Sequence, residues 1–337
     1  MFQINQILNY SKQPNPKQMG IKFLNKYLRT NCPTSIKEIS IAELSGKKIA
    51  IDISIYLYKY ESEDSLLENM YLLLSILRYY NIIPIFIFDG KSPAEKKPVI
   101  QQRINNRADA EIEYKCLKEK IKHIDNEEDK QEIIETLNQL KKKIVYITKP
   151  KVDLVKSLIR SYGVTYYDAH GEADELCAIL VIRKIVWACL SEDMDMFVYG
   201  CNRVIRYFSL MNHTAVLYCT KGILEELQLT QPELRQICIL SGTDYNVNYD
   251  SQSIDLFDIM RYFNKYKQKG PEGFYNWLTS NVKGIDLDIP LLDKINNMFD
   301  VSSNKTLEDY TNISVINTSI NHNLLESILK KDGFIFL

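Results

Sequence analysis

Few residues in this 337-residue sequence are of the kinds that mark fibrous or membrane-spanning proteins. Its 12 Gly and 10 Pro are too few for a collagen-like repeat or a long disordered linker. No apolar run reaches the roughly 18 residues that a membrane-spanning helix needs. Charge of one sign is not in excess either, because 42 Lys and Arg face 43 Asp and Glu. The net charge of −1 excludes a histone-like protein that binds nucleic acid through a general positive charge.

Cysteine and histidine are also sparse, with seven and four residues. The number of Cys is odd, no Cys-x-x-Cys pair occurs and the His residues are scattered, which argues against a zinc site and against a disulfide framework. Most of the Cys lie in apolar stretches and are expected to be reduced core residues of an intracellular protein. Residues 1–18 contain no signal-peptide pattern and are interpreted as a short polar extension.

The sequence does contain enough apolar residues, 45% of the total, for a large core, and they occur in alternating strand and helix patterns. Strands are predicted at residues 47–58, 81–88, 163–168, 185–190 and 204–209. Helices are predicted at 70–77 and 171–184, and two more between 220 and 240 are separated near Pro232. This alternation predicts an α/β fold whose central, mostly parallel sheet is flanked by helices. Residues 246–337 are predicted to be mainly helical with polar loops.

Residues 91–160 differ from the rest of the chain because their charge occurs in blocks. Residues 91–123 carry nine basic and five acidic side chains, residues 124–140 one and six, and residues 141–160 seven and one. The residues Ile100, Ile104, Ala108, Ile112 and Cys116 recur every four positions, as they would along one face of a helix. We interpret residues 91–150 as an inserted helical arch with basic ends and an acidic middle. The alternative, a pair of solvated helices with ordinary charge, is favoured by the charge pattern alone.

Seven acidic residues stand out because they follow apolar runs or lie at the ends of helices. They are Asp52, Asp89, Glu172, Asp174, Asp193, Asp195 and Asp244. Each alone has a simple structural explanation as a turn residue, a helix cap or a partner of the helix dipole. Together at one sheet edge they would raise one another's pKa, and Mg²⁺, which prefers carboxylate oxygens, would remove that penalty. If they converge, they predict phosphodiester hydrolysis assisted by two ions about 4 Å apart.

Six segments in succession resemble the motifs of the flap endonuclease/XPG family of structure-specific 5′ nucleases. They are MGIK at 19–22, KKIAIDISIYLY at 47–58, IPIFIFDGKSPAEKK at 83–97, HGEADELCAILV at 170–181, LSEDMDMFVYG at 190–200 and ILSGTDY at 239–245. The resemblance implies a PIN-like nuclease domain over residues 19–245, with an N-region at 19–123, the arch at about 91–150 and an internal region at 151–245. A compact chain with a degenerate helical C-terminal region at 246–337 would suit a member from a large DNA virus.

The resemblance also implies roles for single residues. One Mg²⁺ would be held by Asp52, Asp89, Glu172 and Asp174, and a second by Asp193, Asp195 and Asp244, with Mn²⁺ as a substitute. Asp174 stands where the family more usually has Glu, and its side chain is one methylene shorter. Lys96 and Arg103 would act as catalytic residues that polarise the scissile phosphate. Arg107 would bind substrate, and Tyr58 would stack on the base beside the cut. A buried core position for Tyr58 is an equal alternative.

The activity implied by the resemblance is Mg²⁺-dependent cleavage of DNA with single-stranded 5′ flaps or ends. The basic arch would admit a single strand and bind its phosphates, so that the enzyme reads structure and not sequence. It would act as an endonuclease and a 5′–3′ exonuclease in replication, repair or recombination, leaving a 5′-phosphate and a 3′-hydroxyl. We expect a monomer in the nucleus, either the host nucleus or a viral replication site. Two alternatives stay open: a 5′ exoribonuclease of related fold, and a catalytically silent scaffold that binds junctions.

The sequence departs from the family pattern after ILSGTDY. There the family has a glycine-rich helix–hairpin–helix that grips duplex DNA, whereas residues 246–254 contain no Gly. A helix is still predicted at 254–266, so the helix–hairpin–helix is interpreted as degenerate and the duplex would be held differently. The C-terminal residues LKKDGFIFL contain no recognisable sliding-clamp motif.

Residues 1–18 precede the MGIK motif, with which the family normally begins. Either translation begins at Met19, or an extension passes near the site. Deleting residues 1–18 is expected to leave nuclease activity intact or to raise it. The measurement is the rate of flap cleavage by the full chain and by a chain that begins at Met19. A large loss of activity after the deletion would show that the extension belongs to the fold or to the substrate path.

Overall fold

The computed structural model describes residues 21–123, 126–246, 254–268, 273–301, 313–331 and 333–334. Three predicted features lie wholly or largely outside these residues. They are the extension at 1–18, the Met19-Gly20 pair and most of the glycine-free segment at 246–254. Within the described residues, no helix has both the length and the apolar character that crossing a membrane requires.

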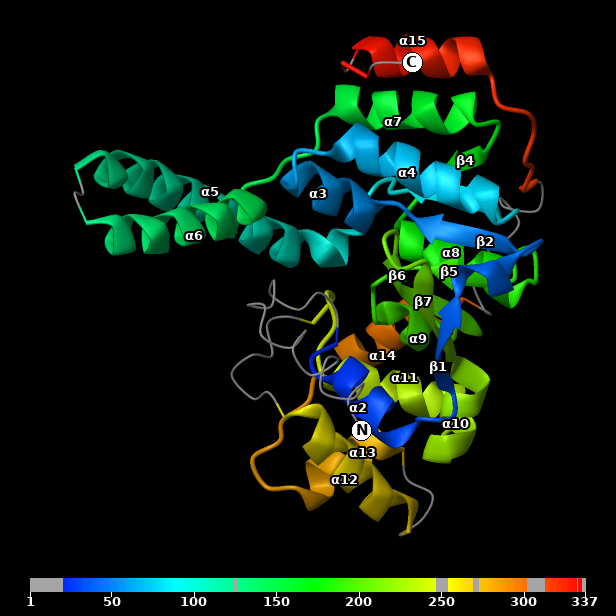
Figure 1. Ribbon diagram of the computed structural model, residues 1–337. Helices are drawn as coiled ribbons and strands as arrows, with labels where there is room; N and C mark the ends of the chain where they lie inside the picture. Colours follow the sequence, from blue (N-terminus) through cyan, green and yellow to red (C-terminus); the bar gives the residue numbers. More distant parts are fainter. Residues whose placement is uncertain are drawn as a thin grey trace, which may run out of the picture.

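A seven-stranded sheet forms the centre of the molecule, in the order β1-β7-β6-β5-β2-β3-β4 (Figure 1). Its strands are β1 (Ile36–Ser40), β2 (Lys48–Asp52), β3 (Ile83–Phe88), β4 (Thr165–Asp168), β5 (Ala188–Leu190), β6 (Arg203–Ser209) and β7 (Thr214–Cys219). Neighbouring strands from β6 to β4 run parallel. Strand β7 pairs antiparallel with β6 and with β1. The predicted α/β fold with a mostly parallel sheet is confirmed.

Helices cover both faces of the sheet. They are α2 (Leu24–Asn31), α3 (Ser54–Ser62), α4 (Leu66–Tyr79), α7 (Lys149–Ser161), α8 (Ala173–Ile182), α9 (Asp195–Tyr199), α10 (Thr220–Leu227), α11 (Gln231–Leu240), α12 (Leu256–Lys267), α13 (Phe274–Asn281), α14 (Ile289–Phe299) and α15 (His322–Lys331). Because side chains alternate along a strand, Ile49 and Ile51 of β2 belong to a core with α3, α4, α7 and α15, whereas Ala50 belongs to a second core with α2, α8, α9 and α11–α14. The helices predicted around residues 70–77, 171–184, 220–240 and 254–266 are all present.

The predicted strand at 47–58 is wrong in its second half. Strand β2 ends at Asp52, and α3 begins at Ser54. The β-branched residues favour an extended chain, but the Asp52 carboxylate accepts a hydrogen bond from the Ser54 backbone N–H at 3.1 Å and turns the chain. The buried side chains of α3 then follow helical spacing, at Tyr56, Leu57 and Tyr60. Strands β1 and β7 are absent from the prediction, and few of their positions are buried: one in β1 and two in β7.

The predicted helical insertion is confirmed. After the short 3₁₀ helix η3 (Ala94–Lys96) come α5 (Lys97–Lys120), η4 (Ile121–His123) and α6 (Glu127–Lys143). Helices α5 and α6 lie side by side and project from the body of the molecule (Figure 1). The apolar stripe marks the helical period but no buried face, because Ile104 is 49% exposed and Ile112 is 68% exposed. A projecting two-helix hairpin has no sheet to cover that side.

Residues 313–331 pass beside the turn between α7 and the edge strand β4. Thr318 N–H donates to the Gly163 carbonyl at 2.8 Å, and Asn321 N–H donates to the Ser161 carbonyl at 2.7 Å. Arg78 of α4 donates to the Thr318 carbonyl at 2.7 Å. Helix α15 then packs on α7 (Figure 1). These contacts satisfy backbone carbonyls at the turn between α7 and β4.

The close approach at Gly163 gives a prediction about stability. Gly163 has a φ of +66°, and a Cβ there would lie 2.3 Å from Thr318 Oγ1 and 2.7 Å from the Ser319 carbonyl oxygen. Gly284 has a φ of +83° and nothing within 4 Å of such a Cβ, so it controls for backbone strain. Gly163→Ala is expected to lower the free energy of unfolding by about 1–3 kcal/mol more than Gly284→Ala, measured by denaturant titration. Equal losses would show that the clash is relieved without cost.

Candidate active site

The topology brings most of the predicted acids to one edge of the sheet. Asp52 is the last residue of β2, Asp89 follows the end of β3, and Asp193 and Asp195 follow the end of β5. These three strands are parallel neighbours, so their carboxyl ends lie together. This edge is where open α/β sheets bind their ligands.

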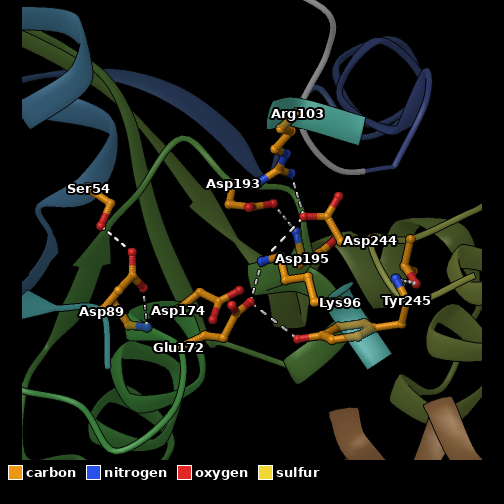
Figure 2. Close-up of polar contacts among 12 residues, drawn as sticks. Ser54, Asp89, Lys96, Arg103, Glu172, Asp174, Asp193, Asp195, Asp244 and Tyr245 are labelled. Atoms are coloured by element: carbon orange, nitrogen blue, oxygen red, sulfur yellow. Dashed lines mark hydrogen bonds and ion pairs between the residues drawn. The ribbon is translucent and has the colours of Figure 1, made fainter. Parts of the chain in front are cut away.

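Two helices supply the remaining acids. Glu172 is the N-cap residue of α8 and Asp174 lies in its first turn. Asp244 lies in the loop that follows α11. One carboxylate oxygen from each of Asp174, Asp193 and Asp195 lies within 4.8 Å of the other two. Figure 2 shows Asp89, Glu172 and Asp244 around this group.

Hydrogen bonds from serine and backbone groups hold the carboxylates in place. Ser191 Oγ donates to Asp52 at 3.1 Å and accepts from the Asp193 N–H, also at 3.1 Å. The Asp195 N–H donates to Asp193 at 2.9 Å. Asp89 accepts from Ser54 Oγ and, at 2.9 Å, from the Ala173 N–H of α8 (Figure 2). Neither serine belongs to the predicted site, although Asp-x-Ser at 52–54 and Ser-x-Asp at 191–193 are spacings at which such local hydrogen bonds form.

Burial and mutual repulsion make the carboxylates difficult to ionise without a cation. Burial, followed by the charge of Asp89, raises the pKa of Asp52 to about 7. Burial and the charge of Asp193 raise the pKa values of Asp174 and Asp195 well above the ordinary range. Burial, with a contribution from Asp244, raises the pKa of Asp193. The site therefore favours a bound cation or bound protons.

Two basic residues from the base of the arch supply positive charge that offsets part of the negative charge of the carboxylates. Lys96 Nζ forms an ion pair with Glu172 and lies 3.3 Å from Asp244 Oδ2. Arg103 Nη2 donates to the same Asp244 oxygen at 2.7 Å. Burial alone would lower the pKa of Lys96, but the charges of Glu172, Asp174 and Asp244 raise it overall. Figure 2 shows both side chains directed at the carboxylates.

The donor set fits hard divalent cations. Every candidate ligand is a carboxylate oxygen, and no thiol or imidazole belongs to the cluster found among the described residues. Asp195 Oδ1 is buried and has no hydrogen-bond partner, so it is an acceptor that a cation would satisfy. Asp174 lies with Asp193 and Asp195, the pair that the resemblance assigns to the other ion.

The two predicted substrate-binding residues lie outside the carboxylate cluster. Tyr58 on α3 is 44% exposed, so the alternative of a buried core tyrosine is wrong. Arg107 on α5 places its guanidinium over the Tyr146 ring, 5.5 Å from the ring centre. Tyr245, which was not a predicted site residue, directs its hydroxyl at Glu172 at 3.4 Å.

Two family models match the chain: the XPG N-terminal domain over residues 19–110 and the XPG I-region over residues 163–244. Together they match 174 of the 337 residues. The chain belongs to the XPG family. All seven carboxylates, Lys96 and Arg103 lie inside the matched ranges.

Curated relatives agree with this assignment. Flap endonuclease 1-A of Oryza sativa subsp. japonica is 33% identical over 246 residues, which are 67% of this chain and 62% of the plant protein. The chain thus spans less than two-thirds of the length of that relative. "Probable RAD2-like endonuclease 369L" of Invertebrate iridescent virus 6 is 28% identical over 352 residues, 88% of this chain and 83% of the viral protein.

Solved structures confirm the nuclease fold. The catalytic core of Rad2 in complex with DNA substrate has a TM-score of 0.66 at 18% identity, covering 93% of this chain and 95% of that one. Flap endonuclease-1 from Methanococcus jannaschii has a TM-score of 0.62 at 22% identity, covering 93% of each chain. GEN1 in complex with product DNA and Mg²⁺ has a TM-score of 0.58 at 18% identity, covering 93% of this chain and 73% of that one.

The raised pKa values predict how the metal-free protein responds to pH. The folded protein binds more protons than the unfolded chain between the ordinary Asp pKa of 3.8 and the value of about 7 for Asp52. Stability therefore falls as pH rises through this window. Melting curves in EDTA are expected to move to lower temperature between pH 5 and pH 7.5. Asp195→Asn removes one buried charge and is expected to raise the melting temperature at pH 7.5 by several degrees, because ~1 kcal/mol corresponds to ~2–4 °C.

Asp153→Asn on α7 is the matched control, since it removes an exposed carboxylate that does not belong to the cluster. It is expected to leave the melting temperature nearly unchanged. A stabilisation of the same size in both variants, or none in Asp195→Asn, would contradict the electrostatic explanation.

Proposed function

We propose that this chain is a structure-specific 5′ nuclease that hydrolyses phosphodiester bonds in DNA flaps or branched DNA, as an endonuclease and as a 5′–3′ exonuclease. The observation that carries the proposal is the buried carboxylate cluster at Asp174, Asp193 and Asp195, with two cations from the base of the arch beside it. The names of the relatives, and the DNA bound to the Rad2 core and to GEN1, support the same activity.

The cofactor that we propose is a pair of Mg²⁺ ions, with Mn²⁺ as a substitute. Asp52, Asp89, Glu172 and Asp174 would hold one ion, and Asp193, Asp195 and Asp244 the other, with Asp174 close enough to contribute to both. Bound there, the ions would supply Lewis-acid stabilisation of charge on the scissile phosphate. The Mg²⁺ in the GEN1 complex supports this choice of metal.

Lys96 and Arg103 would act directly on the substrate. Both now pair with carboxylates that the ions would neutralise, so metal binding would free them to turn to a phosphate. A positive charge fixed beside the scissile phosphate stabilises the charge that develops in the transition state. Because both residues stand at the base of the arch, a strand must pass the arch to reach them.

The arch and α3 would give selectivity for structure. A single strand fits beside a helical hairpin more readily than a duplex does, and basic side chains such as Arg107 would bind its phosphates. The exposed ring of Tyr58 is available to stack on a base next to the cut, a contact that tolerates any sequence. We further propose that the protein acts as a monomer where DNA is replicated, in the host nucleus or at a viral replication site. The viral relative supports the latter.

Cleavage of a labelled 5′-flap DNA duplex tests this proposal. Wild-type protein with Mg²⁺ is expected to release the flap with a 3′-hydroxyl, and EDTA to abolish the reaction. Asp193→Ala is expected to lower the rate by at least ~10²–10³-fold, because it removes a group that organises transition-state charge. Asp153→Asn, at an exposed position of α7, should retain the wild-type rate.

Two comparisons separate the alternatives. Equal or faster cleavage of an RNA flap of the same geometry would favour an exoribonuclease. Flap binding that persists in Mg²⁺ without scission would favour a silent junction-binding scaffold. Cleavage by Asp193→Ala at the wild-type rate would show that the carboxylate cluster is not the site.

A further inference from the structure

Helix η3, at the base of the arch, is held largely by polar contacts, and the first buried residue after it is Val99 of α5. Helix η3, which carries Lys96, contains no buried residue. Just before it, Gly90 N–H donates to the Gly171 carbonyl at 2.8 Å and Lys91 N–H to the His170 carbonyl at 3.1 Å, so the chain is fixed up to Lys91. Beyond that point, the ion pairs that η3 makes with other described residues are those of Lys96 with the acids and one of Glu95. The position of Lys96 therefore depends on these pairs.

The partner of Glu95 is far away in the sequence. Lys294 on α14 places its Nζ 3.0 Å from Glu95 Oε1. The hydrogen bond from Lys294 lowers the pKa of Glu95. The side chains are 60% and 27% exposed, so both can be changed without opening the core.

Helix α14 is a fixed reference for this contact. Phe299 at its end is fully buried, with its ring centre 4.8 Å from that of Tyr199 and 5.4 Å from that of Tyr245. Tyr245 in turn touches Glu172, the partner of Lys96. Asp300, the residue after the helix, pairs with the buried Arg235 of α11 at 3.7 Å. The aromatic contacts connect α14 to Tyr245, which contacts Glu172 in the carboxylate site. Packing therefore fixes the position of α14, and of Lys294 on it, relative to the site.

We propose that Lys294 is a positioning residue that holds η3, through Glu95, so that Lys96 stands at the right place for the scissile phosphate. This inference rests on the proposed nuclease function. If Lys96 turned from Glu172 and Asp244 to a substrate phosphate, the Lys294–Glu95 ion pair could stay formed. The C-terminal region thereby takes part in catalysis without touching the substrate.

A charge exchange tests the proposal. Lys294→Glu and Glu95→Lys each place like charges together, and each is expected to lower kcat on a 5′-flap DNA by about 3–10-fold, because small displacements of a catalytic group reduce the rate strongly. The double variant Lys294→Glu/Glu95→Lys restores an opposite-charge pair and is expected to recover kcat to within about twofold of wild type. KM should change less than kcat in the single variants, because the lost contact positions a catalytic group and does not bind DNA.

Lys283→Glu is the matched control, since it changes the net charge equally at an exposed position between α13 and α14. It is expected to leave kcat unchanged and to report the general effect of charge on KM. A direct contact of Lys294 with DNA would give a different pattern: Lys294→Glu would raise KM, Glu95→Lys would not repair it, and Glu95→Gln would leave kcat intact. Any of these three results would overturn the proposal.

A second measurement does not depend on activity. Amide hydrogen exchange in the segment 92–97 is expected to speed up in each single variant and to return to the wild-type rate in the double variant, while exchange in the sheet stays constant. Unchanged exchange in the single variants would overturn the positioning role even if the wild type cleaves flaps. If the wild type does not cleave, the nuclease function fails, and the exchange data still decide whether Lys294 holds η3.

Discussion

The rest of this structure depends on one constraint: several carboxylates lie close together at a partly buried site. The parallel order of β5, β2 and β3 brings Asp52, Asp89 and Asp193 to one edge, and α8 adds two more acids from the side. Serine hydroxyls and backbone N–H groups offset part of the repulsion, yet the pKa values of Asp52, Asp174, Asp193 and Asp195 stay raised. Such a cluster lowers the stability of the free protein, which is the usual cost of a functional site. A bound cation or bound protons would offset this cost.

The arch is the element that brings protein cations to this edge. Lys96 and Arg103 lie where the chain enters the arch, and they form ion pairs with Glu172 and Asp244. A net charge of −1 therefore conceals a strongly uneven distribution, with acids gathered at the sheet edge and bases in the residues that frame it. The net charge alone argues against binding of nucleic acid, but the local charge decides which side chains a phosphate meets.

Sequence patterns predict those parts of the molecule that local rules govern. Apolar runs place β3 and α8, and the spacing of acids around them predicts a carboxylate site, because parallel strands must end together. The sequence pattern does not predict that strand β2 ends at Asp52, because the hydrogen bond of the Asp52 side chain overrides the preference of the following β-branched residues for an extended chain. The stripe on α5 has the right period for a helix, but periodicity cannot tell whether another element covers it. The contact of Lys294 with Glu95 joins residues that no local pattern relates, so only the folded chain reveals it.

Ion pairs also attach the arch where the chain leaves it, after α6. Lys141 at the end of α6 pairs with Asp64, and Lys151 at the start of α7 pairs with Glu61 of α3. Ion pairs thus connect the region of α3, which carries Tyr58, to the end of the arch at α6 and α7. At the beginning of the arch, an ion pair connects η3, which carries Lys96, to α14. Exposed ion pairs are weak and are screened by salt, whereas the packed cores beneath them are not. Ion pairs that hold the arch are therefore more sensitive to salt than the packing of the sheet is.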